Sequence, residues 1–134
     1  MSLDIKKEWL KASKLDLESI SYILEVEHLT TIVAFHAQQA IEKSFKAIIE
    51  KVDKKIPKQH DLIKLKALFE DIYPIEADEN VLDTLNQLYI ESRYPGDLGL
   101  LPYGKPSIED AKIFYQLAKD IFGQTCNLLN IKDI

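Results

Sequence analysis

The chain has 134 residues, of which 46% are hydrophobic, a length and composition that suit one folded domain over residues 1–134 and exclude intrinsic disorder. Its net charge of −5 argues against general attraction to nucleic acid, duplex DNA included. No stretch is apolar enough to cross a membrane, no leader-like run stands at the N-terminus, and one cysteine excludes an internal disulfide framework, so we expect a cytoplasmic protein.

The first predicted helix runs from Asp4 to about Val26 and carries two apolar stripes, so we expect it to pack against two neighbours. Asp16 continues one stripe. There it lies either at the rim of a bundle or opposite a cation inside it, and we expect the rim. Thr30 or Thr31 is placed to cap the next helix.

Residues 31–49 contain no Gly or Pro and carry an apolar belt wider than a surface helix needs, which predicts the central helix of a bundle. Against this belt runs a polar ladder, made of Gln38, Glu42 and Lys46 with Gln39 and Lys43 one position round. The ladder is either an ordered polar seam or only the solvated edge of the helix.

Three further helices are predicted. One spans residues 62–72, with Asp61 at its N-terminus and Pro74 after it, and the next runs from Asp78 to about Tyr89. Residues 95–106 hold three of the five prolines and three of the four glycines, which indicates a shaped loop. A capping-box-like start at residues 107–110 opens the last helix, which we expect to be weakest at Gly123. The predicted fold is all-α, an antiparallel bundle of four to five helices.

The segment from Glu42 to Lys66 holds eight lysines against four acidic residues, so it carries +4 and the remainder of the chain −9. A basic patch on an acidic body could accept a phosphate or one strand of nucleic acid. The other interpretation is a solvated, lysine-rich helix end that favours the helix dipole.

Arg93 is the single arginine beside sixteen lysines, and it stands where a helix meets the Pro/Gly loop. Its planar guanidinium suits a phosphate or carboxylate, or a structural clamp to Asp97. Tyr94 could stack on a base or plug the end of the bundle. His60, beside Asp61 at the end of the basic segment, is the best acid–base candidate by position.

Motifs for common cofactors are missing. No histidine pair has the HxxxH spacing of a metal site, and no Walker, GxGxxG or GxSxG motif occurs. We therefore expect neither a metal nor another cofactor.

Three segments in this order resemble the prokaryotic HEPN domain family: AQQAIEKSFKAII at residues 37–49 taken with Phe35, His60-Asp61-Leu62, and YIESRYPGD at residues 89–97. The resemblance implies a four- or five-helix bundle, related to the substrate-binding-subunit bundles of nucleotidyltransferases. It also implies a homodimer that pairs with a minimal nucleotidyltransferase in a toxin–antitoxin-like system.

Some HEPN proteins are metal-independent RNases, marked by an Arg followed after four to six residues by a His. Arg93 matches the first position, but positions 98, 99 and 100 are Leu98, Gly99 and Leu100. The motif therefore lacks its histidine, the expected acid–base group.

We therefore expect a non-catalytic module that binds a nucleotide or RNA phosphate. The candidate ligand-binding residues are Gln39, Lys43, Lys46, His60, Arg93, Tyr94 and Asp97. Two alternatives stay open. One is a bundle with a purely structural or protein-interaction role, and the other is a divergent RNase that uses Arg93 with His60 or Tyr94.

Overall fold

A computed structural model describes residues 3–92 and 105–134, except for the side chains of residues 91 and 92. All regular structure in these ranges is helical, which confirms the all-α prediction. The elements are α1 (Ile5–Ile23), a 3₁₀ helix η1 (Glu27–Leu29), α2 (Thr30–Lys51), α3 (Leu62–Ala67), α4 (Glu79–Ser92) and α5 (Ile108–Leu129). None of the described helices is long and apolar enough to span a membrane.

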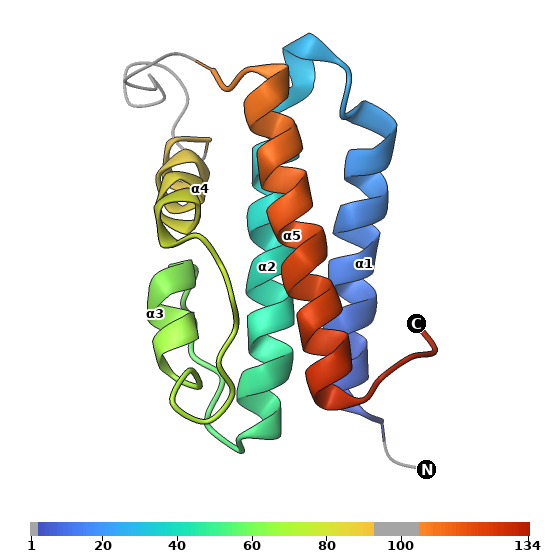
Figure 1. The fold of residues 1–134 in the computed structure, drawn as a ribbon, viewed down its shortest axis with the longest axis vertical. Helices are drawn as coiled ribbons and strands as arrows, with labels where there is room; N and C mark the ends of the chain where they lie inside the picture. The colour runs from blue at the N-terminus through green and yellow to red at the C-terminus, as the bar shows by residue number, and fades with distance from the viewer. Residues whose placement is uncertain (1–2, 93–104) are drawn as a thin grey trace.

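Helix α2 lies at the centre of the bundle, with α1 and α5 packed along it and α3 and α4 stacked end to end on its remaining flank (Figure 1). Helices α1 and α4 run antiparallel to α2, whereas α5 runs in the same direction as α2. At the start of α5, Lys105 Nζ donates to the Glu27 carbonyl, 3.1 Å away. At its far end, Lys7 Nζ and Asp133 Oδ2 lie 2.7 Å apart, which places that end beside the start of α1.

The predicted apolar belt of α2 is the core of the protein. Its fully buried apolar residues are Val33, Ala37, Ala40, Ile41, Phe45, Ala47, Ile48 and Ile49. Small side chains let α1 approach closely: Ser13 Oγ donates to the Ala40 carbonyl at 2.7 Å and lies 3.1 Å from Ser44 Oγ. Buried hydrogen bonds therefore join the two helices at this point.

Most of the predicted helix starts are confirmed. Asp4 and Asp61 accept hydrogen bonds from backbone amides as N-caps of α1 and α3, and Ser107 forms a reciprocal capping box with Asp110. The prediction for α2 is wrong: its N-cap is Leu29, without a side-chain cap, and the Thr30 hydroxyl is buried with no partner in the described structure.

Helix α3 is shorter than its apolar spacing predicted. It ends at Ala67, and the chain continues in tighter turns in which the Phe69 amide donates to the Lys66 carbonyl at 3.2 Å. These turns still place Phe69 in the core, 5.3 Å from the Phe45 ring. The apolar spacing therefore predicted correctly that Phe69 is buried, but it overestimated the length of the helix. In contrast, α5 continues through Gly123 without a break.

The segment after α2 positions the candidate site. Asp53 adopts a left-handed conformation (φ 58°), and the Lys54 amide returns to the Ile49 carbonyl, which closes the end of α2. The chain then runs back along α2 without helical structure, so that His60 lies beside the middle of that helix.

Candidate functional site

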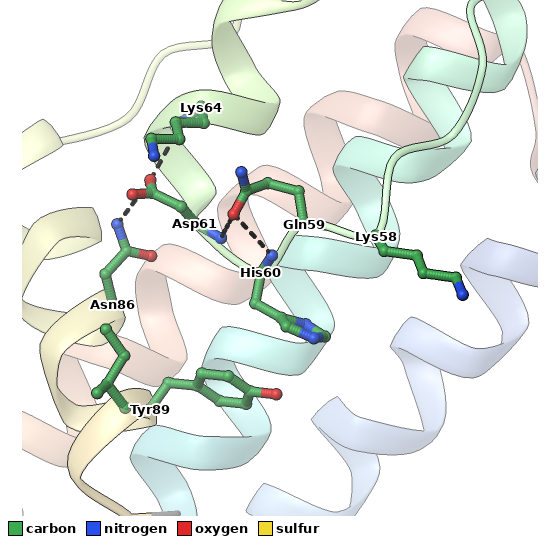
Figure 2. Close-up of a pocket in the computed structure, with 8 residues that line it drawn as sticks. Lys58, Gln59, His60, Asp61, Lys64, Asn86 and Tyr89 are labelled. Carbon is green, nitrogen blue, oxygen red and sulfur yellow. Dashed lines mark hydrogen bonds between the residues drawn. The ribbon is translucent and has the colours of Figure 1, made fainter.

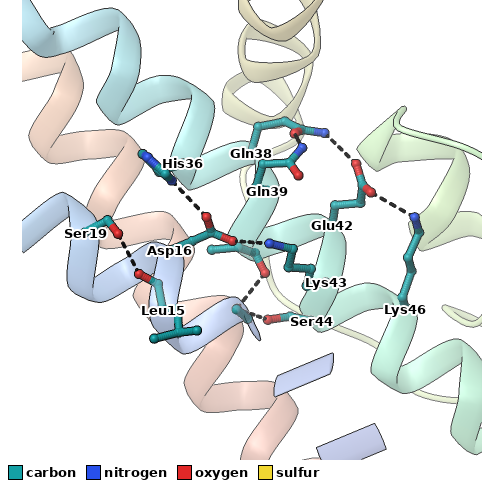
Figure 3. Close-up of polar contacts among 12 residues, drawn as sticks. Leu15, Asp16, Ser19, His36, Gln38, Gln39, Glu42, Lys43, Ser44 and Lys46 are labelled. Atoms are coloured by element: carbon teal, nitrogen blue, oxygen red, sulfur yellow. Dashed lines mark hydrogen bonds and ion pairs between the residues drawn. The ribbon is translucent and has the colours of Figure 1, made fainter. Parts of the chain in front are cut away.

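The polar ladder of α2 is an ordered network of hydrogen bonds rather than a solvated edge (Figure 3). Gln38, Glu42 and Lys46 are buried, and Gln39 and Lys43 are partly exposed. Glu42 is the centre of the network, with a side chain only 6% exposed. Lys46 Nζ donates to Oε2 at 2.8 Å, and Gln38 Nε2 donates to Oε1 at 3.1 Å. His60 Nδ1 lies 2.9 Å from Oε1, so a loop residue joins the ladder from outside the helix.

Glu42 carries a negative charge at neutral pH. Burial alone would raise the pKa of this carboxyl group, but hydrogen bonds from Lys46 and His60, together with the charge of Lys46, hold the pKa below its ordinary value. Because an ionised carboxylate only accepts hydrogen bonds, Nδ1 of His60 carries the proton between them. The Glu42 carboxylate thereby sets the orientation of the His60 ring.

A second carboxylate occupies the equivalent position on the α1 side of the ladder. Asp16 Oδ1 lies 2.8 Å from His36 Nδ1, and Oδ2 accepts from Lys43 Nζ at 2.7 Å (Figure 3). The expectation that Asp16 lies at the rim is wrong, since its side chain is 10% exposed. Two partners two helical turns apart on α2 compensate the burial of this carboxylate.

A pocket of about 430 Å³ opens beside His60, between the segment before α3 and helix α4 (Figure 2). Its lining residues are Lys58, Gln59, His60, Asp61, Lys64, Asn86, Tyr89 and Ile90. Gln38 Nε2 donates to the His60 carbonyl at 2.9 Å and thereby holds the His60 backbone in place. Glu42 holds the His60 ring. The His60 side chain is 47% exposed, and its Nε2 has no hydrogen-bond partner in the described part of the chain.

Most other polar groups of the pocket are engaged in holding its walls. Asp61 caps α3, Asn86 Oδ1 accepts from the Leu62 amide at 2.9 Å, and Asn86 Nδ2 donates to Asp61 at 3.0 Å. Within residues 3–92 and 105–134, Lys58 and Lys64 are exposed and make no ion pair. These two ammonium groups and the His60 ring are therefore available to an anion.

The aromatic ring of Tyr89 lines the pocket beside His60. Tyr89 on α4 is buried, its ring lies 5.2 Å from that of His60, and it stacks on Phe35 of α2 with ring centroids 5.7 Å apart. This packing fixes the end of α4 against α2.

The predicted ligand-binding residues of α2 are mostly engaged within the protein. Lys43 and Lys46 are each paired with a carboxylate, and Lys46 also lies over the Trp9 ring at 5.5 Å. Gln39 Nε2 donates to Gln38 Oε1 at 2.6 Å. These lysines therefore have less charge to offer a phosphate than the sequence suggested.

The predictions for Arg93, Tyr94 and Asp97 lie outside the described residues. In contrast, the structure adds Asn86 and Tyr89, which sequence reasoning did not place at the site. Lys58 and Lys64 also line the pocket, and both belong to the basic segment from Glu42 to Lys66. No sequence signal existed for Asn86, because its partner Asp61 is 25 residues away.

The profile of the HEPN domain family matches residues 6–127. The chain belongs to the HEPN family. No protein of curated function matches the sequence significantly. The HEPN domain is similar in fold to the crystal structure of TT1696 from Thermus thermophilus, with a TM-score of 0.70 and 20% sequence identity over 93% of this chain and 98% of that one.

In this HEPN domain one residue of the pocket lies close in sequence to the predicted Arg motif. Tyr89 lines the pocket, α4 ends at Ser92, and Arg93 is the next residue in the sequence. Among the described residues, no group of three or more His, Cys, Asp or Glu side chains is arranged to hold a metal ion.

Proposed function

We propose that this HEPN-domain protein binds the phosphate of a nucleotide or of RNA in the pocket beside His60, without catalysing a reaction. The observation that carries the proposal is that Lys58, Lys64 and the exposed His60 line one pocket. The two lysines have no carboxylate partner among the described residues. Phosphate oxygens accept hydrogen bonds from such groups and neutralise their charge.

The size and position of the pocket support this proposal. A volume of about 430 Å³ falls within the range of small-ligand sites. We include Arg93, Tyr94 and Asp97 in the proposed site as residues predicted from the sequence, in which they follow Tyr89 by four, five and eight positions. Lys43 and Lys46 contribute by orienting the carboxylates of the ladder rather than by contacting the ligand.

We further propose that the protein works as a homodimer and pairs with a minimal nucleotidyltransferase in a toxin–antitoxin-like system. Membership of the HEPN family supports the dimer, since HEPN domains often dimerise. Light scattering after size-exclusion chromatography tests the dimer, and co-purification with a nucleotidyltransferase encoded beside it tests the pairing. A monomeric mass at micromolar concentration would contradict the proposed homodimer. Separate elution of the two proteins would contradict the proposed pairing.

Thermal unfolding with ATP, GTP, AMP and a short single-stranded RNA tests ligand binding. A ligand at a hundred times its Kd stabilises the native state by about 2.7 kcal/mol, so a clear rise in Tm is expected. The double variant Lys58→Gln/Lys64→Gln should lose that rise. The matched control is Lys55→Gln, which removes an exposed lysine of the same segment that does not line the pocket. Equal loss in both variants would argue for general charge attraction rather than a site.

Metal-independent cleavage of RNA is a second candidate function, favoured by one observation. Glu42 holds Nδ1 of His60 and leaves Nε2 free to exchange a proton with a substrate hydroxyl. Recovery of intact RNA after the binding experiment excludes this candidate. Cleavage that is lost in both Arg93→Ala and His60→Gln would replace the binding proposal with an RNase. Absence of both binding and cleavage would leave a protein-interaction role.

A further inference from the structure

We infer that the ligand is a single-stranded oligonucleotide that occupies two adjacent subsites, one at His60 and a second at His36. The inference rests on the proposed phosphate-binding function and narrows its ligand from any nucleotide to a single strand. It follows from the described structure, in which one arrangement of side chains is repeated on the two sides of α2. The pocket beside His60 contains only one of the two arrangements.

The two arrangements have the same composition and connectivity. At one, Glu42 lies between His60 Nδ1 at 2.9 Å and Lys46 Nζ at 2.8 Å. At the other, Asp16 lies between His36 Nδ1 at 2.8 Å and Lys43 Nζ at 2.7 Å. In each arrangement the charges of the carboxylate and the ammonium group cancel, and the imidazole is the group left to interact with a ligand.

Each imidazole is suited to meet a phosphate through Nε2. Because Nδ1 faces a carboxylate in each unit, Nε2 is the ring nitrogen left to meet a ligand, and an imidazolium ring donates a hydrogen bond through it. The side chains of His36 and Lys43 are 27% and 25% exposed, so this second unit reaches the surface. A phosphate oxygen supplies the acceptor that the protonated ring needs.

A row of aromatic rings connects the two units. The His36 ring lies 5.7 Å from Phe35, Phe35 lies 5.7 Å from Tyr89, and Tyr89 lies 5.2 Å from His60. Each step is a direct ring contact, so the two imidazoles belong to one continuous stretch of the molecule. Phe35, which is partly exposed, and the buried Tyr89 lie between the two imidazoles in this row, and Phe35 is the one that a base could contact.

This arrangement fits a single strand better than a mononucleotide or a duplex. A mononucleotide carries its phosphates at one end and therefore fills one unit only. A single strand carries one phosphate for each nucleotide, with an exposed base face between consecutive phosphates, whereas a duplex hides its base faces by stacking. The two imidazoles and the ring between them match the alternation of phosphate and base in a single strand.

Affinity as a function of ligand length tests the inference on the wild-type protein. The probes are 2′-O-methyl oligoadenylates of one, two and four nucleotides with a 5′-phosphate, which lack the 2′-hydroxyl that metal-independent cleavage needs. Calorimetric titration should show Kd falling by about tenfold or more from one nucleotide to four, the gain expected from an added phosphate and base contact.

Two histidine variants locate the second subsite. His36→Gln should remove most of the gain with length while the affinity for the mononucleotide stays within about twofold of wild type. His28→Gln is the matched control, since His28 is exposed in η1 and makes no ion pair within the described ranges. It should change neither affinity, and each variant is first checked for unchanged thermal unfolding.

The outcomes separate this inference from the function on which it rests. Equal affinity for one and four nucleotides, or unchanged tetranucleotide affinity in His36→Gln, would overturn the second subsite and leave phosphate binding at His60 in place. If Lys58→Gln/Lys64→Gln also left mononucleotide binding unchanged, or if no probe bound, the proposed function would fail as well.

Discussion

His60 and Glu42 join two parts of the chain that are 18 residues apart, with Nδ1 of the imidazole 2.9 Å from Oε1 of the carboxylate. Through this contact a buried charge in the central helix controls the orientation of an exposed ring in the pocket. Glu42 therefore contributes both to the stability of the bundle and to the geometry of the candidate site.

Replacement of Glu42 by Gln should lower the free energy of unfolding by about 2 kcal/mol at pH 7, because Lys46 loses its buried counter-charge. The pKa of Glu42 lies below its ordinary value of 4.5 in the folded protein, so its stabilising effect is complete above that value. The effect is lost as the pH falls through the lowered folded pKa. The difference between wild type and Glu42→Gln should accordingly shrink in that acid range.

Urea denaturation from pH 7 to pH 3 measures this difference. Glu18→Gln is the control, since Glu18 is exposed and makes no ion pair within residues 3–92 and 105–134. A stability difference for Glu42→Gln that stays constant across the range would show that its charge is not what stabilises the fold.

Asp16→Asn should destabilise the packing of α1 on α2 by about 2 kcal/mol, since it leaves Lys43 partly buried without a counter-charge. The contact predicts coupling: the double variant Asp16→Asn/Lys43→Gln should cost less than the sum of the two single changes. Chemical denaturation of all four proteins gives the coupling energy, and strictly additive losses would argue against the ion pair.

Ala40→Leu should destabilise the protein by about 2 kcal/mol, because Ala40 is fully buried where Ser13 of α1 reaches its carbonyl. A larger side chain there forces α1 away from α2. Ala67→Leu adds the same volume at an exposed position at the end of α3 and should cost little. Similar Tm values for the two variants would contradict the close approach of α1 and α2.

Asn86→Ala should cost about 1–3 kcal/mol, because the buried Leu62 amide loses its acceptor and Asp61 loses a donor. The loss should be local, at the junction of α3 and α4 that forms one wall of the pocket. Amide hydrogen exchange should therefore accelerate at Leu62 relative to the centre of α2. Uniform acceleration along the chain would point to global destabilisation instead.

The features that the sequence predicted well are those that depend on neighbouring residues. The apolar belt of α2, the cap at Asp61 and the capping box at Ser107 each follow from residues within a few positions of one another. The family resemblance also rests on local motifs, and the match over residues 6–127 confirms it.

The features that escaped prediction depend on contacts between distant segments. Asp16 is buried only because His36 and Lys43, 20 and 27 residues away, compensate its charge. The turn that returns the chain to Glu42 is left-handed at Asp53, where the sequence has no glycine that would have predicted it. Similarly, Lys43 looked available to a ligand because its partner Asp16 is 27 residues away in the sequence and meets it only in the folded chain.

One helix sets the spacing between the two imidazoles. His36 is part of α2 and His60 is anchored on it through Glu42, six residues further along, a rise of about 9 Å. Insertion or deletion of a single residue between these positions would rotate one end of α2 by about 100° against the other. Such a change would break the core and misalign the imidazoles together. Length variation among relatives of this protein should therefore fall in the connections rather than in α2.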